Sequence, residues 1–223
     1  MELILPEALV LLALDNRQGQ LLIPDYSLSY GLCGALLLEL IVQDCIEIEV
    51  KSQLVKPKNN APSDELLIDT LRMIKAENKL HELKFWVENI PNRMKDLRNI
   101  IIKRLVSKQL LQEAEGKILF IKFHTYPTQN PEVELALKTQ IIQAVLHNQN
   151  EVDYSTILLT RLTHACNLFP EIFNRHELKI AVQELHKLQS AHGVDEAVHA
   201  AVEAMDASLA CIAATCAITA ATS

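Results

Sequence analysis

The stretch Gly31–Val50, GLCGALLLELIVQDCIEIEV, decides the fold class of this 223-residue chain. Residues 31–42 are apolar except for Glu39, and this run is shorter than the ~20 apolar residues that a helix needs to cross a bilayer. From Ile46 to Val50 apolar and charged residues alternate, which is typical of a strand with one buried face. We therefore predict a buried helix that turns directly into a strand, and no membrane span.

The composition favours helices. Hydrophobic residues make up 49% of the sequence, enough for a substantial core, whereas aromatic residues make up 4% and glycines number five, too few for a β-sandwich. Because no linker divides the chain, we expect one mainly α-helical globular domain over residues 1–223, with a buried helical core surrounded by amphipathic helices and short β-hairpins. The hairpins are expected near residues 20–24, 46–55 and 117–123. Further helices are expected over residues 3–14, 66–77, 80–88, 91–111, 132–147, 156–169, 176–190 and 194–222.

Charge and cysteine content limit the partner and the compartment. The formal net charge is −7, which disfavours generic nucleic-acid binding because such binding relies on neutralising phosphates. Five cysteines are scattered through apolar segments without a Cys-x-x-Cys pair, so we expect buried thiols in a reducing compartment. No basic region precedes the apolar N-terminal residues, so no signal peptide is expected. The uncharged segment 207–223 is expected to form a buried terminal helix rather than a membrane anchor.

The sequence contains no recognisable catalytic motif, so we expect no enzyme, no metal site and no cofactor. His164 and Cys166 are two positions apart and point in different directions on a helix, so a core histidine is expected there rather than a catalytic dyad. Glu39, within the apolar run, is expected to cap backbone amides or to pair with a base rather than to act as a catalytic acid.

The sharpest local feature is the basic segment Arg93–Lys108, RMKDLRNIIIKRLVSK, which holds six bases and one acid in a chain that is acidic overall. Lys95 and Arg98 are three positions apart on one flank of the predicted helix, close to its expected start at Pro91. Such a pair can bind a phosphate with a guanidinium fork, an ammonium group and free backbone amides. From spacing alone, a solvated helix face is the more frequent explanation.

Five segments occur in a recognisable order: LPEALVLLALDNRQGQL, SYGLCGALLLELIVQDCIEIE, MKDLRNIIIKRLVSKQLL, FHTYPTQNPEVELALKTQIIQAVL and LTRLTHACNLFPEIF. Together, from about Leu3 to Ile218, they resemble the Golgi phosphoprotein 3 family. The resemblance implies a peripheral membrane protein without enzymatic activity. It also implies an adaptor that binds phosphatidylinositol 4-phosphate at Golgi membranes and retains glycosyltransferases there through their cytoplasmic tails.

The resemblance also implies a lipid headgroup pocket, which falls on Lys95 and Arg98, the pair already selected by helical spacing. Two further family positions, an arginine and a tryptophan, fall on Cys33 and on or near Pro24. The change from arginine to cysteine removes a bidentate phosphate donor, and the loss of tryptophan removes a ring suited to the headgroup layer. We therefore expect a headgroup site at Lys95, Arg98, Cys33 and Pro24 that is weak or less selective.

The predicted strand 117–123 is apolar on both faces, which is more than a strand with one buried face needs. The resemblance implies a hairpin that contacts membrane or a second copy of the chain, here through Phe120, Ile121 and Phe123. A hairpin covered by the C-terminal helices is the equal alternative. The expected partners are an anionic membrane lipid (a phosphoinositide) and the cytoplasmic tails of membrane proteins, and a homo-oligomer is expected. The expected location is the cytoplasm, bound peripherally to membranes, and the Golgi membrane in a eukaryotic cell.

A second class of function remains open from the sequence. Arg93–Lys108 followed by Lys117–Phe123 has the order of a recognition helix and a wing, as in a winged-helix module that binds nucleic acid or protein without lipid. The net charge of −7 weighs against nucleic acid as the partner. A small hydrolase is disfavoured because no triad, dyad or metal set is present in the sequence.

Overall fold

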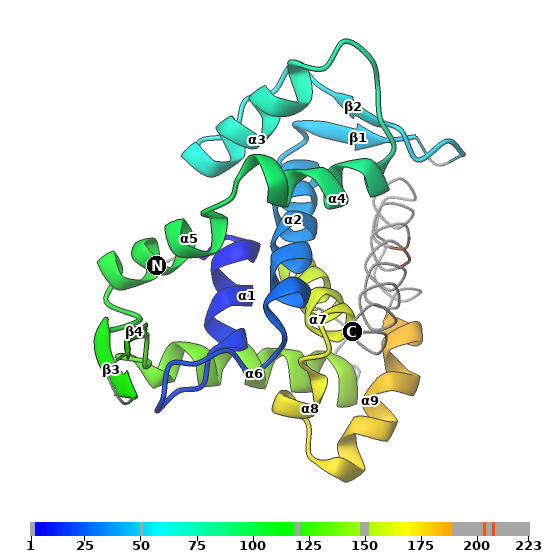
Figure 1. Ribbon diagram of the computed structural model, residues 1–223. Coiled ribbons are helices and arrows are strands. Elements are labelled where there is room, and N and C mark those ends of the chain that lie inside the picture. Colours follow the sequence, from blue (N-terminus) through cyan, green and yellow to red (C-terminus); the bar gives the residue numbers. More distant parts are fainter. Residues whose placement is uncertain are drawn as a thin grey trace, which may run out of the picture.

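The computed structural model describes residues 3–49, 51–118, 121–147 and 152–188, together with residues 203 and 207. It is mainly helical, as predicted, with two small antiparallel hairpins (Figure 1). The elements in chain order are α1 (Leu5–Ala13), α2 (Asp25–Val42), β1 (Ile46–Ile48), β2 (Val55–Pro57), α3 (Glu65–Lys75), α4 (Leu83–Arg93), α5 (Leu97–Ser107), β3 (Ala114–Ile118), β4 (Ile121–Thr125), α6 (Pro131–Leu146), α7 (Tyr154–Ala165), α8 (Phe169–Ile172) and α9 (Arg175–Leu188).

Helix α2 is the centre of the fold. It packs against α1, α3, α4, α5 and α7, and Figure 1 shows it running through the middle of the molecule. By length and composition α2 could cross a membrane, but more than half of it is buried inside the protein. The apolar residues 31–42 therefore belong to a core helix, and β1 follows this helix after a short turn, as predicted.

Helix α2 begins at Asp25 rather than at Gly31, where the apolar run begins. Pro24 takes the position before the first helical residue, and its fixed φ suits the entry of the chain into a helix. Leu28 and Leu32 lie one turn apart and are both buried, so the first turns already contribute to the core. The sequence did not indicate this start, because polar residues and tyrosines separate the buried Leu28 and Leu32.

Helix α1 lies beside α2, and all nine of its residues are buried. The carboxylate of Glu39 on α2 accepts a hydrogen bond from the backbone N–H of Leu5, 2.9 Å away, at the start of α1. This confirms the expectation that Glu39 caps a backbone amide. A Cβ atom added to Gly31 would lie 2.3 Å from Sγ of Cys166, so glycine is needed where α2 approaches the end of α7.

The structure confirms two of the three predicted hairpins. Ile46 pairs with Pro57 in the first, and Ile118 pairs with Ile121 in the second. The single strand expected over 117–123 is wrong, because β3 ends at Ile118 and β4 begins at Ile121. The hairpin expected near residues 20–24 is wrong, because the described chain there forms one isolated bridge, between Leu14 and Leu21. The helix expected over 194–222 lies outside the described residues, apart from the single residues 203 and 207.

The helix expected to run from Pro91 to Leu111 is also wrong. Helix α4 continues through Pro91 to Arg93, and α5 starts separately at Leu97. Proline usually starts a helix or ends one, but here Trp86 and Ile90 of α4 are buried, and α4 packs on α2. Tertiary packing therefore keeps Pro91 helical, and the chain breaks three residues later.

Candidate functional site

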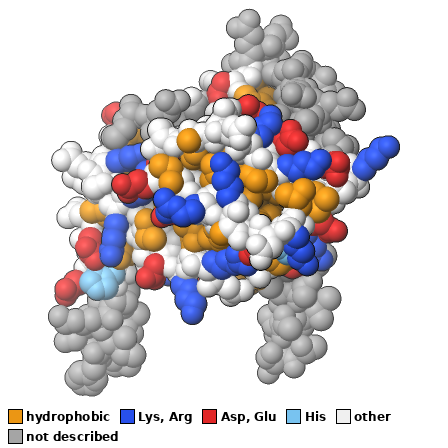
Figure 2. Space-filling view, turned by 90° about the horizontal axis from the view of Figure 1, so that it is seen from above, with side chains coloured by type: hydrophobic (Ala, Val, Ile, Leu, Met, Phe, Trp, Pro, Cys, Tyr) orange, Lys and Arg blue, Asp and Glu red, His pale blue; other side chains and the backbone are white. Residues whose placement is uncertain are grey.

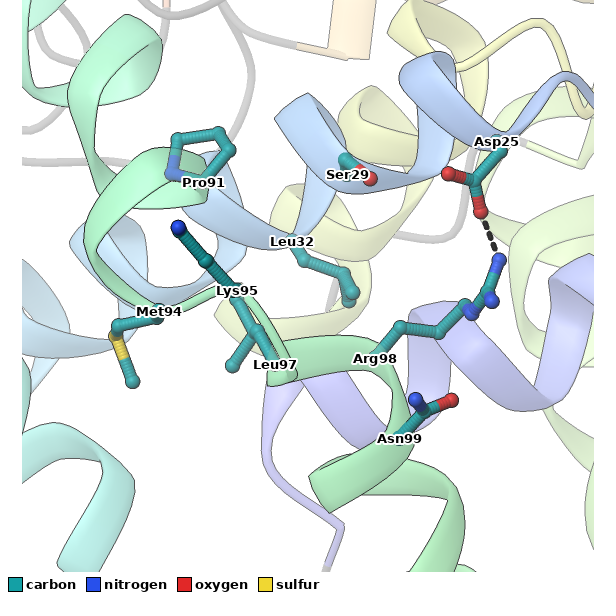
Figure 3. A pocket seen from close by; sticks show the side chains of 9 residues that line it. All are labelled: Asp25, Ser29, Leu32, Pro91, Met94, Lys95, Leu97, Arg98 and Asn99. Atoms are coloured by element: carbon teal, nitrogen blue, oxygen red, sulfur yellow. Dashed lines mark hydrogen bonds and ion pairs between the residues drawn. The ribbon is translucent and has the colours of Figure 1, made fainter.

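The break between α4 and α5 forms one wall of a pocket of about 100 Å³, and the first turns of α2 form the other (Figure 3). Lys95 lies in the break, and Arg98 lies in the first turn of α5. The two bases are therefore not on one flank of a single helix, as the spacing had predicted, but they line the same pocket. The lining residues are Asp25, Ser29, Leu32, Pro91, Met94, Lys95, Leu97, Arg98 and Asn99.

The two cations reach opposite sides of this pocket. In Figure 3 the Lys95 ammonium points toward Pro91, the Arg98 guanidinium points toward Asp25, and Leu32 lies between them. The first turn of α5 lines the same pocket through Leu97, Arg98 and Asn99. The N–H of Leu97 donates to the Met94 carbonyl oxygen at 3.0 Å, and those of Arg98 and Asn99 lie in the turn that has no acceptors inside the helix. The positive end of the helix dipole adds to the two side-chain charges. The arrangement suits an anionic group.

One of these two cations is already paired with a carboxylate of the protein. Arg98 forms an ion pair with Asp25, the first residue of α2 (Figure 3). The side chains of Arg98 and Asp25 are 37% and 65% exposed. Ion pairs with this exposure contribute about 0–1 kcal/mol to stability, so the pair is easily exchanged for another anion.

Other bases of the segment Arg93–Lys108 have structural roles. The Lys108 ammonium lies 2.6 Å from Oε2 of Glu7, a fully buried residue of α1, and Nε of Arg104 lies 3.5 Å from its Oε1. Arg104 also pairs with Asp64. Arg104 and Lys108 thus join α5 to the core instead of lining an open recognition surface. This weakens the winged-helix alternative.

Arg93 is likewise engaged within the fold. Its guanidinium lies 2.7 Å from the Glu77 carboxylate and within about 6 Å of the rings of Phe85 and Trp86. On the face shown in Figure 2, which is the α3–α4 end of the molecule, basic side chains are scattered among hydrophobic ones. A wider groove, of about 710 Å³, is lined by Asp69 and Asp96 as well as by Arg72, Arg93 and Lys95. Arg72 is paired with Asp69, and Arg93 is paired with Glu77.

The two other predicted site residues do not line the pocket. Cys33 is fully buried, its Sγ donates a hydrogen bond to the Ser29 carbonyl oxygen, and burial raises the pKa of its thiol far above the usual value. Pro24 is exposed and precedes α2. Sequence reasoning missed Asp25 and Ser29, which do line the pocket. They are one helical turn apart after Pro24, a pattern that indicates a shared face only once the helix start is known.

The remaining candidates have the following places. Ile121 and Phe123 lie in β4, where Phe123 pairs with Gly116 of β3, and Phe120 lies outside the described residues. His164 is exposed, so the expectation of a core histidine is wrong, although its ring contacts Phe169 edge-on. Burial raises the pKa of the Cys166 thiol to about 12, so no reactive thiolate forms there at neutral pH. Among the described residues, no group of three or more histidines, cysteines or carboxylates is placed to hold a metal ion.

The sequence is similar to those of known proteins. The model of the family described as Golgi phosphoprotein 3 (GPP34) matches residues 5–205. Vacuolar protein sorting-associated protein 74 of Schizosaccharomyces pombe is 21% identical over 183 residues, which cover 74% of this chain and 54% of that protein. The chain thus spans about half the length of this curated relative.

Proposed function

Because the chain belongs to the Golgi phosphoprotein 3 family, we propose that it is a Golgi-associated peripheral membrane adaptor whose pocket between α2 and α5 binds an anionic lipid headgroup. Phosphatidylinositol 4-phosphate is the lipid we assign to this pocket. The fission-yeast relative is a vacuolar protein sorting-associated protein, and this supports a role in membrane traffic. No catalytic step is part of this proposal.

One observation carries the proposal: Lys95 and Arg98 line a single pocket together with the first turn of α5. A phosphomonoester offers about two negative charges and three strong acceptor oxygens. Arg98 supplies a planar pair of donors, Lys95 supplies a point charge, and the first-turn N–H groups supply fixed donors. These are the groups that recognise a terminal phosphate that projects from a membrane.

The test is sedimentation with phosphatidylcholine vesicles, with and without phosphatidylinositol 4-phosphate. Lys95→Ala combined with Arg98→Ala removes two charge-assisted contacts, each worth about 1.5–3 kcal/mol, so the affinity for the phosphoinositide vesicles should fall at least a hundredfold. The melting temperature should change little, because both side chains are at the surface.

Lys75→Ala combined with Lys103→Ala is the matched control. Both lysines are exposed, and their removal takes away the same charge from α3 and from a later turn of α5. Lys108 is unsuitable as a control because it holds the buried Glu7. Equal losses in the two double variants would mean diffuse electrostatic attraction rather than a pocket. Failure of the wild-type protein to bind phosphoinositide vesicles would remove the lipid function. A shift of duplex DNA by the wild-type protein would instead favour the winged-helix alternative.

A further inference from the structure

The ion pair between Asp25 and Arg98 joins the starts of α2 and α5 across the pocket (Figure 3). Among the nine residues that line the pocket, Asp25 is the one carboxylate. It holds one of the two cations that the proposed function assigns to a phosphate. Any anionic ligand must therefore compete with a carboxylate that belongs to the protein itself.

We propose that Asp25 is a specificity-determining residue of this pocket. Its carboxylate acts as a built-in competitor at Arg98, so that a doubly charged phosphomonoester displaces it, whereas a singly charged phosphodiester or carboxylate does not. The inference rests on the proposed headgroup site. It adds that the site discriminates between anionic ligands by their charge.

The selection follows from tethering. The packing of α2 against α5 holds the Asp25 carboxylate beside Arg98, so it competes as an intramolecular group, at an effective concentration on the order of millimolar. A singly charged ligand offers Arg98 no more charge than Asp25 already does, and it also meets the repulsion of the Asp25 carboxylate. A singly charged ligand therefore gains little binding free energy by replacing Asp25 at Arg98.

A phosphomonoester gains more binding free energy by replacing Asp25. With about two charges and three acceptor oxygens it can engage Arg98, Lys95 and the first-turn N–H groups of α5 at once. The displaced Asp25 side chain, already 65% exposed, then returns to water. Its remaining repulsion is weakened by solvent and by salt.

The experiment compares wild-type protein with Asp25→Asn, which keeps the size of the side chain and removes its charge. The probes are phosphatidylcholine vesicles that contain either phosphatidylserine or phosphatidylinositol 4-phosphate, matched in total negative charge. Asp25→Asn should raise the affinity for phosphatidylserine vesicles about tenfold and that for phosphoinositide vesicles by less, so that the preference for the phosphomonoester falls. Adding Arg98→Ala should abolish the gain, because Asp25 acts through Arg98.

Asp69→Asn is the matched control. Asp69 on α3 pairs with Arg72 at 2.6 Å, both side chains are well exposed, and neither residue lines the pocket. Its removal changes the net charge equally and should strengthen binding to both kinds of vesicle slightly and alike. Asp25→Ser, which also suits a helix start, repeats the test if the asparagine variant folds poorly.

The failures are distinguishable. If Asp25→Asn behaves like Asp69→Asn, or if it raises the preference for the phosphoinositide, the competitor role is overturned, while the pocket stands as long as the Lys95 and Arg98 variants still lose binding. If folded wild-type protein and folded Asp25→Asn both ignore every vesicle, the competitor role and the proposed lipid function fall together.

Discussion

Replacing Lys108 by methionine should destabilise the protein strongly, because it leaves a carboxylate buried without its closest cation. Glu7 is fully buried in α1, and the Lys108 ammonium lies 2.6 Å from its Oε2. Removing one partner of a buried ion pair costs about 3–5 kcal/mol. The lower end applies here, because Lys108 is 23% exposed and Glu7 keeps Arg104 at 3.5 Å and the N–H of Ile4 at 3.2 Å.

The measurement is thermal unfolding followed by circular dichroism, supported by urea titration. In a chain of this length, 3 kcal/mol lowers the melting temperature by roughly 6–12 °C. Adding Glu7→Gln to Lys108→Met removes the stranded charge, so the double variant should lose less stability than Lys108→Met alone, about 1–2 kcal/mol. Lys103→Met, an exposed position on the same helix, should change the free energy of unfolding by no more than about 0.5 kcal/mol.

Two results would refute this reasoning. If Lys108→Met costs no more than Lys103→Met, water or another group solvates Glu7 and the pair is not a buried one. If the double variant is no more stable than Lys108→Met, the loss comes from the packing of the lysine stem and not from an uncompensated charge.

Three further predictions follow from the same packing. Burial opposes the ionisation of Asp64, but hydrogen bonds from Arg104 and from backbone N–H groups hold the pKa of Asp64 below its usual value, so its stabilisation is present above about pH 4 and is lost as the pH falls through the folded-state pKa. Asp64→Asn should flatten the decline of the melting temperature in this acid range. Gly31→Ala should cost about 1–3 kcal/mol through its clash with Cys166, and Cys166→Ala in the same chain should restore part of the loss in urea titrations. Ile121→Asp in β4 should give a folded protein of smaller assembly size in analytical ultracentrifugation, whereas unfolding would mean that the hairpin is covered within one chain.

The sequence predicted the core of the fold because strong periodic signals specify burial. The apolar run after Gly31 indicated a buried helix and the alternation after Ile46 a strand, and α2 contains that run while β1 begins at Ile46. Leu97, Ile101 and Leu105, which recur at helical spacing in the basic segment, are buried in α5, whereas Met94, at the same spacing, is half-buried and precedes α5. The burial of these positions follows from the local spacing of apolar residues, which can be read from a single sequence.

Helix boundaries were predicted less well because tertiary contacts override local signals. Proline at position 91 indicated a helix start, yet burial of the preceding turn keeps it inside α4. The segment after Pro24 lacked a continuous apolar run, so the first turns of α2 went unrecognised. The partner of Arg98 lies on those turns, 73 positions away in the sequence, and no local pattern announces such a pair.

The misplaced boundary also changes how Lys95 and Arg98 must be understood. On one unbroken helix from Pro91 the two bases would be neighbours on a surface, and the N–H group of Arg98 would bond within the helix. The break at Met94–Asp96 makes Arg98 part of the first turn of α5, and residues of this turn line the pocket shared with α2. Lys95 and Arg98 therefore line opposite sides of a pocket instead of lying side by side on a helix surface. The proposed anion site therefore depends on the interruption of the helix, and the two bases alone would not supply it.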